Sequence, residues 1–129
     1  MSPAKLGAVS ACFIVMDVDR TIAFYKDKPG FEVRFREPDA DPSFAIVGRD
    51  TAQLFVKAER NVLPQPNGTR HPHLRLDAFV YVEDPDAHAA ELSGRGVEFS
   101  APLEDTSDGL RGFEIRDPDG YVLFFGRPR

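Results

Sequence analysis

Short runs of apolar residues, alternating with polar ones, predict strands separated by a helix in the first half of this chain. Residues 10–15 are small or apolar and precede the acidic Asp17 and Asp19, which predicts a strand and then a helix with Asp19 as its N-cap. We expect the helix to end before Pro29. Further strands are predicted at residues 31–36, 44–47 and 52–56. The first half is therefore expected to form a βαβββ unit.

The second half repeats this order at a nearly constant offset. Val15 and Val82 are 67 positions apart, as are Asp17 and Asp84. Its expected elements are a strand at 77–82, a helix at 87–92, strands at 97–99, 112–116 and 121–125, and a tight turn at 117–120. A duplicated βαβββ module accounts for this repetition.

These elements predict an α+β fold in which the paired βαβββ modules form one curved, eight-stranded mixed sheet. The helices would lie outside and a concave cleft inside. We expect a single domain over residues 1–129. Its modules would cover about 8–57 and 75–126, joined by a polar, proline-containing linker at about 58–74.

Strand alternation predicts which side chains face the concave cleft. Ala11, Phe13 and Val15 are expected under the first helix, and Ala78, Val80 and Val82 under the second. The residues that alternation leaves in the cleft are Ser10, Cys12, Ile14, Asp77, Phe79 and Tyr81. The cleft would thus be apolar and aromatic, with one carboxylate, that of Asp77.

Composition narrows the classes of partner. The formal net charge of −5 argues against a general nucleic-acid-binding surface, and we expect a small-molecule ligand instead. A single cysteine, Cys12, excludes an intrachain disulfide. No run approaches the about 20 apolar residues of a membrane-spanning helix, and no secretion signal is recognisable, so a cytoplasmic protein without membrane partners is expected.

Three stretches, at 17–25, 30–33 and 116–123, resemble the vicinal oxygen chelate superfamily. This superfamily includes glyoxalase I, extradiol dioxygenases, and fosfomycin- and bleomycin-resistance proteins. The resemblance covers nearly the whole chain. It implies paired βαβββ modules and a homodimer whose subunits together enclose the binding clefts.

Metal enzymes of that superfamily place a divalent ion on four concave positions, usually two His and two Glu. Carried over to this chain, the positions are occupied by Ser10, Phe55, Asp77 and Phe124. The resemblance therefore adds Phe55 and Phe124 to the expected cleft, and Gln53 and Val122 are expected there with them. Two phenyl rings and a hydroxyl are poor ligands for a divalent ion. We therefore expect no metal and no cofactor, and the closest resemblance is to the metal-free, bleomycin-resistance-like branch.

Other residues with reactive or metal-binding side chains favour structural roles. His71 and His73 lie in the linker without an obvious third metal ligand, and His88 is expected to face solvent on the second helix. Asp117 and Asp119 are expected to stabilise their turn.

Three hypotheses for function remain open. The first is a non-catalytic protein that sequesters a planar ligand, with or without a cationic group, such as an antibiotic. The second is a vicinal oxygen chelate enzyme, a lyase, isomerase or dioxygenase of unknown substrate, which leaves the assignment as an enzyme open. The third is a protein with a filled cleft that acts through partner binding.

Overall fold

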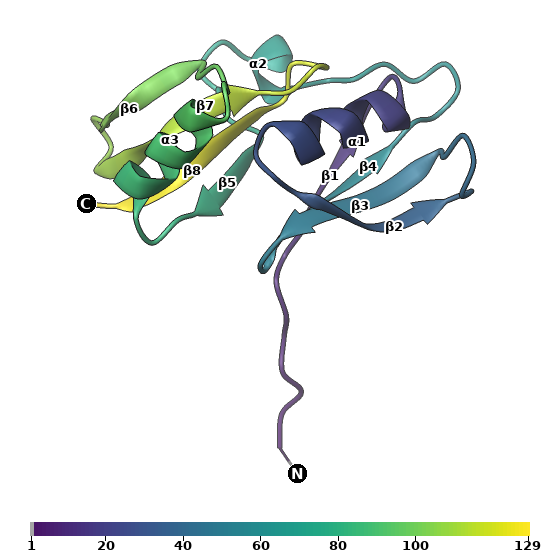
Figure 1. Ribbon diagram of the computed structural model, residues 1–129, viewed down its shortest axis with the longest axis horizontal. Coiled ribbons are helices and arrows are strands. Elements are labelled where there is room, and N and C mark those ends of the chain that lie inside the picture. Colours follow the sequence, from purple (N-terminus) through teal and green to yellow (C-terminus); the bar gives the residue numbers. More distant parts are fainter. Residues whose placement is uncertain (1) are drawn as a thin grey trace.

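The computed structural model describes residues 2–129, and its first half is the predicted βαβββ unit (Figure 1). Its elements are β1 (Ala11–Ile14), α1 (Val18–Asp27), β2 (Glu32–Glu37), β3 (Phe44–Arg49) and β4 (Ala52–Lys57). The strands form a sheet in the order β1-β4-β3-β2. β1 is parallel to β4, and the other two neighbouring pairs are antiparallel.

The second half has the same topology. Its elements are β5 (Ala78–Tyr81), α3 (Pro85–Gly94), β6 (Ala101–Asp105), β7 (Leu110–Arg116) and β8 (Val122–Pro128). They form a sheet in the order β5-β8-β7-β6. Figure 1 shows α1 lying along one sheet and α3 along the other, with the N-terminal segment extending away from the body. The predicted α+β class with paired modules is confirmed, but the eight strands lie in two four-stranded sheets.

Three local expectations are corrected. The N-cap of α1 is Asp17, not Asp19: Asp17 has extended backbone angles and accepts from the Arg20 amide at 3.1 Å. Residues 97–99 are not a strand, because the Val97 amide closes the end of α3 by donating to the Leu92 carbonyl. The linker contains a short helix, α2 (Asn67–Arg70).

Burial confirms the predicted alternation in the strands that begin each module. Phe13 and Val15 are in the core, whereas Cys12 is exposed. Phe79 and Tyr81 are 43% and 59% exposed, and Val80 between them packs against the core. The two sheets and their helices share one hydrophobic core that includes residues of both modules.

Polar and aromatic contacts join the modules at this core. The Phe13 and Tyr121 rings stack with centroids 4.2 Å apart, and the Tyr121 hydroxyl donates to the Ile14 carbonyl at 2.6 Å. Tyr25 of α1 donates to Asp117 Oδ2 at 2.8 Å. These bonds cross from one module to the other and fix their relative positions.

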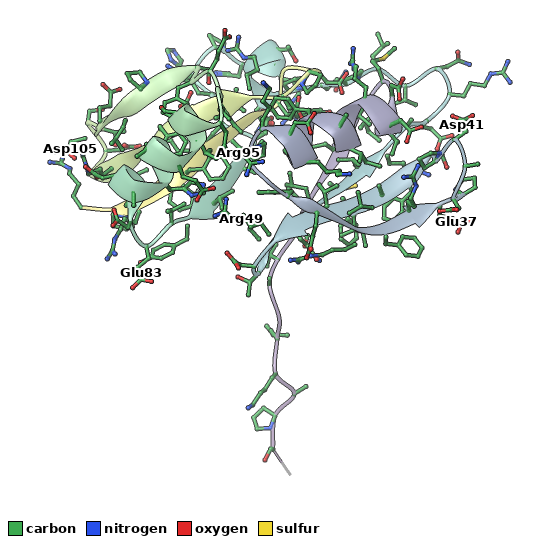
Figure 2. The ribbon with its side chains drawn as sticks, in the orientation of Figure 1. Glu37, Asp41, Arg49, Glu83, Arg95 and Asp105 are labelled. Atoms are coloured by element: carbon green, nitrogen blue, oxygen red, sulfur yellow. The ribbon has the colours of Figure 1, made fainter. Side chains whose placement is uncertain are left out.

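Two arginines extend the junction outside the core. Figure 2 shows Arg49 and Arg95 where the modules meet. Arg49 makes two hydrogen bonds to the Glu91 carboxylate, at 2.7 and 2.9 Å, and Arg95 donates to the backbone carbonyls that end α1. His88 lies beside this pair and is half-buried, with its ring near those of Phe113 and Phe125. The expectation that His88 faces solvent is therefore wrong.

The buried Asp117 carboxyl makes stability depend on pH. Burial raises its pKa from 3.8 to about 6, although the hydrogen bonds from Tyr25 and two backbone amides favour the ionised form. A raised pKa in the folded state gives a stabilising contribution that is complete below pH 3.8 and is lost as the pH rises through about 6.

We therefore predict a pH-dependent difference between the wild type and Asp117→Asn. The free energy of unfolding of the wild type, relative to that of the variant, should fall by about 2 kcal/mol between about pH 4 and about pH 7. Urea denaturation of both proteins across this range measures the difference, because the other titrating groups cancel. Parallel curves for the two proteins would contradict the raised pKa.

Candidate functional site

The residues predicted to share one cleft lie along several neighbouring cavities. Cys12, Ile14 and Asp77 line a cavity of about 690 Å³, and Ser10, Gln53, Phe79 and Tyr81 line one of about 440 Å³. Phe124 lines a third cavity of about 560 Å³, and Val122 a fourth of about 470 Å³. Nine of the ten predicted residues thus lie along four cavities instead of one cleft, and the 440 Å³ cavity joins Ser10 and Gln53 of the first module to Phe79 and Tyr81 of the second.

The cavity of about 690 Å³ is lined mainly by β1 and the linker. β1 supplies Cys12 and Ile14, and the linker supplies Asn61, Val62, Leu63, Gln65, Asn67 and Arg70. Val62 and Leu63 are exposed, and Gln65 is held by a hydrogen bond from its amide to the Tyr121 hydroxyl at 3.2 Å. The linker, which the sequence presented only as a connection between modules, therefore forms a wall of a candidate binding cavity.

An aromatic pair forms the centre of the second concave surface. Phe79 of β5 and Phe124 of β8 are directly paired in register, and their rings stack with centroids 5.5 Å apart. Phe124 lies against Gly112 and Gly126, where any side chain would overlap its ring. Phe124 is 4% exposed, so Phe79 presents the accessible aromatic surface of this pair.

Phe55 belongs to a separate aromatic group on the first sheet. Its ring meets that of Phe44 edge to face at 5.6 Å, and Phe44 meets Phe35 at 6.0 Å. Phe35 is 48% exposed. Each module thus carries its own aromatic concave surface, and the two surfaces are not one wall.

Asp77 is committed to hydrogen bonds within the fold. Its Oδ1 accepts from the Asn67 amide at 2.6 Å and its Oδ2 from the Val122 amide at 2.8 Å. Its own amide donates to the Val122 carbonyl, which extends the pairing of β5 with β8. The sequence predicted this carboxylate as the charged group of the cleft. In the structure both of its oxygens accept backbone hydrogen bonds, and it anchors the start of α2.

A second carboxylate with little exposure, that of Glu114, lines a cavity and was not among the residues predicted for the cleft. Glu114 of β7 is paired with Phe124 of β8 and lines the 560 Å³ cavity. Its side chain is 9% exposed and accepts from Arg75 at 2.8 Å. Strand alternation applied to β7 would have identified this residue, because Glu114 alternates with the core residues Phe113 and Ile115 and so lies on the concave side.

The residues at the superfamily's metal positions do not fit a divalent ion. Phe55 and Phe124 offer no donor atom, and both oxygens of Asp77 already accept backbone hydrogen bonds. Within residues 2–129, no three His, Cys, Asp or Glu side chains form a cluster that could hold a metal. His71 and His73 lie near each other, with ring centroids 5.5 Å apart, without a third ligand.

Comparison with known proteins identifies the family. The model of the Glyoxalase/Bleomycin resistance protein/Dioxygenase superfamily matches residues 7–125. The chain belongs to this superfamily. A search of curated proteins finds no significant match.

Solved structures of the glyoxalase/bleomycin-resistance superfamily include antibiotic-binding proteins that resemble this chain. The bleomycin-binding protein of Streptomyces verticillus, in complex with copper(II)-bleomycin, is 26% identical, with a TM-score of 0.70, covering 99% of this chain and 100% of that one. A bleomycin-binding protein complexed with bleomycin is 20% identical, with a TM-score of 0.72, covering 96% and 100%. An antibiotic-binding protein from Streptomyces sp. CB03234 is 22% identical, with a TM-score of 0.70, covering 98% and 100%.

A membrane-spanning segment was not expected from the sequence, and the length and apolar character of the helices bear on this expectation. Among residues 2–129, no helix is long and apolar enough to cross a membrane.

Proposed function

We propose that this protein is a metal-free small-molecule-binding protein that sequesters a planar ligand, with or without a cationic group, such as an antibiotic. The observation that carries the proposal is the stacked pair Phe79 and Phe124, set beside a cavity of about 560 Å³ that contains a carboxylate. Stacked rings offer a flat apolar surface, and a nearby carboxylate favours a positive group. The likeness to bleomycin-binding proteins supports this reading.

We further propose that the whole chain, 1–129, is one domain that acts as a cytoplasmic homodimer. Several large apolar side chains are exposed on or near the concave surfaces, among them Phe35, Leu63 and Tyr81. In the N-terminal segment, Leu6 and Val9 are 96% and 97% exposed. A second copy that covers these side chains would remove apolar surface from water and enclose the cavities. Sedimentation velocity tests this assembly.

A thermal-shift screen tests the proposed binding. The purified protein would be exposed to divalent metals and to planar antibiotics, bleomycin included, and its metal content would be measured on the same preparation. We expect stabilisation by a planar ligand in a metal-free preparation. Stoichiometric metal or a metal-dependent shift would favour an enzyme, and no response to any compound would favour a filled cleft.

Phe79→Ala is predicted to weaken binding of the stabilising ligand about tenfold, because the accessible ring of the aromatic pair is lost. Isothermal titration calorimetry on the wild type and the variant measures this loss. Met16→Ala is the matched control, because Met16 is also exposed, at 56%, and lies in the loop before α1. Equal losses in both variants would contradict a binding role for the aromatic pair.

A further inference from the structure

Glu114 is a buried carboxylate on the floor of the second concave surface. It lies on β7, directly opposite Phe124 on β8, and only 9% of its side chain is exposed. An ionised carboxylate at such a position is unfavourable unless a positive group pairs with it. The position of Glu114 beside the aromatic pair therefore requires a cation at this point of the cavity.

Arg75 supplies that cation when no ligand is present. Its Nη2 donates to Glu114 Oε1 at 2.8 Å, and in the part of the chain described here Arg75 is the one side chain paired with this carboxylate. The two partners differ in their surroundings, because 61% of the Arg75 side chain is exposed. Arg75 also lies between α2 and β5, outside any helix or strand.

An exposed guanidinium on an irregular segment can give way to another cation at its partner. Arg75 regains full hydration when it turns into solvent, and a ligand cation that takes its place keeps the buried Glu114 carboxylate paired. Glu114 has no such freedom, because its strand is paired on both sides, with β6 and with β8. A positive group on a ligand can therefore replace Arg75, whereas Glu114 stays in place.

The remaining charges of this cavity also favour a cationic ligand. Glu104, Asp105 and Asp108 line it together with Glu114, against the single guanidinium of Arg75. Asp105 is paired with Arg111 at 3.1 Å. Glu104 and Asp108 are exposed and contribute negative potential at the cavity mouth, which draws a cation toward Glu114.

We propose that Glu114 binds the cationic group of the ligand, a guanidinium, amidinium or ammonium, in exchange for Arg75, while the planar part of the ligand packs on the exposed Phe79 ring, which Phe124 supports. This inference rests on the proposed sequestering function. It assigns the charge selectivity of the site to Glu114 and gives Arg75 the role of an internal competitor.

A matched pair of dyes separates charge recognition from stacking. The aromatic system is the same in 9-aminoacridine, which is a cation at neutral pH, and in acridine, which is neutral. The chain contains no tryptophan, so the fluorescence of either dye can be followed without an overlapping indole signal. Titrations would use the wild type, Glu114→Gln and Arg75→Met, with Glu104→Gln as the control from the same cavity.

We expect the wild type to prefer the cation. Glu114→Gln should reduce the affinity for 9-aminoacridine about tenfold or more and leave that for acridine unchanged. Arg75→Met should raise the affinity for 9-aminoacridine, because the competing cation is gone. Glu104→Gln should change either affinity less than about threefold, as expected for an exposed charge.

The outcomes distinguish this inference from the proposed function. If the wild type binds both dyes and Glu114→Gln leaves their affinity ratio unchanged, stacking stands and the role of Glu114 is overturned. If Arg75→Met weakens binding of the cation, the exchange is overturned. If the wild type binds neither dye, the proposed aromatic site fails, and the inference fails with it. The opposite signs expected for Glu114→Gln and Arg75→Met exclude general unfolding as the explanation.

Discussion

Gly112→Ala is expected to destabilise the protein by about 3 kcal/mol, near the upper end for overpacking of a core. Gly112 of β7 faces Gly126 of β8 in register. A Cβ atom at Gly112 would overlap the Phe125 carbonyl oxygen and lie 2.7 Å from two ring atoms of Phe124. The ring and the strand would both have to move, so the pairing of β7 with β8 is disturbed. Urea denaturation measures the loss.

The matched control for this substitution is Gly94→Ala. Gly94 is the last residue of α3, and a Cβ atom there meets nothing within 4 Å. Alanine at this position should be neutral or stabilising by up to about 1 kcal/mol. Similar stability of the two variants would show that Phe124 does not lie against Gly112. The double variant Gly112→Ala with Phe124→Ala should lose less stability than the sum of the two single losses, because the overlap with the ring is then absent.

Asp77→Ala is expected to cost about 2–3 kcal/mol of stability, because the amides of Asn67 and Val122 lose their acceptor. Asp77→Asn should cost less, since its side-chain oxygen still accepts one of the two bonds. Thermal and urea denaturation measure both variants. Because Asp77 anchors α2, we also expect the linker to become more sensitive to limited proteolysis.

This pair of variants also tests the alternative role of Asp77. Were its carboxylate a binding group for a metal or a cation, Asp77→Asn would abolish binding and leave stability nearly unchanged. The hydrogen bonds predict the reverse order, with stability affected first. Glu98→Ala is the control, because Glu98 is exposed and outside any helix or strand, and it should change stability by less than about 0.5 kcal/mol.

Much of the fold could be predicted because the two modules repeat the same pattern. The strand beginning each module alternates between core and concave residues, and Phe13 and Phe79 lie on the sides that this pattern assigns. Boundaries were less predictable. Two acidic residues, Asp17 and Asp19, lie where the first helix begins, and only backbone geometry selects Asp17 as the N-cap and places Asp19 in the first turn. Alternation also fails in β2, where the register shifts between Val33 and Phe35.

The candidate site was predictable only in part. Strand alternation placed Phe79 and Asp77 on the concave side and the family resemblance placed Phe124 there, but the direction of a side chain does not reveal its hydrogen bonds. Asp77 accepts hydrogen bonds from two backbone amides, whereas Glu114, which was not among the predicted residues, lines the 560 Å³ cavity. The same limit applies to Arg75, whose partner is 39 residues away in the chain.

The sequence by itself determined the repeated βαβββ module, the side of each strand that faces the core, and the poor metal-binding chemistry at the four family positions. These properties depend on residue type and on spacing along a single element, which are local. The tertiary structure decided how the modules meet, how the cavities divide, and which carboxylate lies beside the aromatic pair. Those properties depend on contacts between distant segments, such as Tyr25 with Asp117 and Arg75 with Glu114, and no local pattern encodes such pairings.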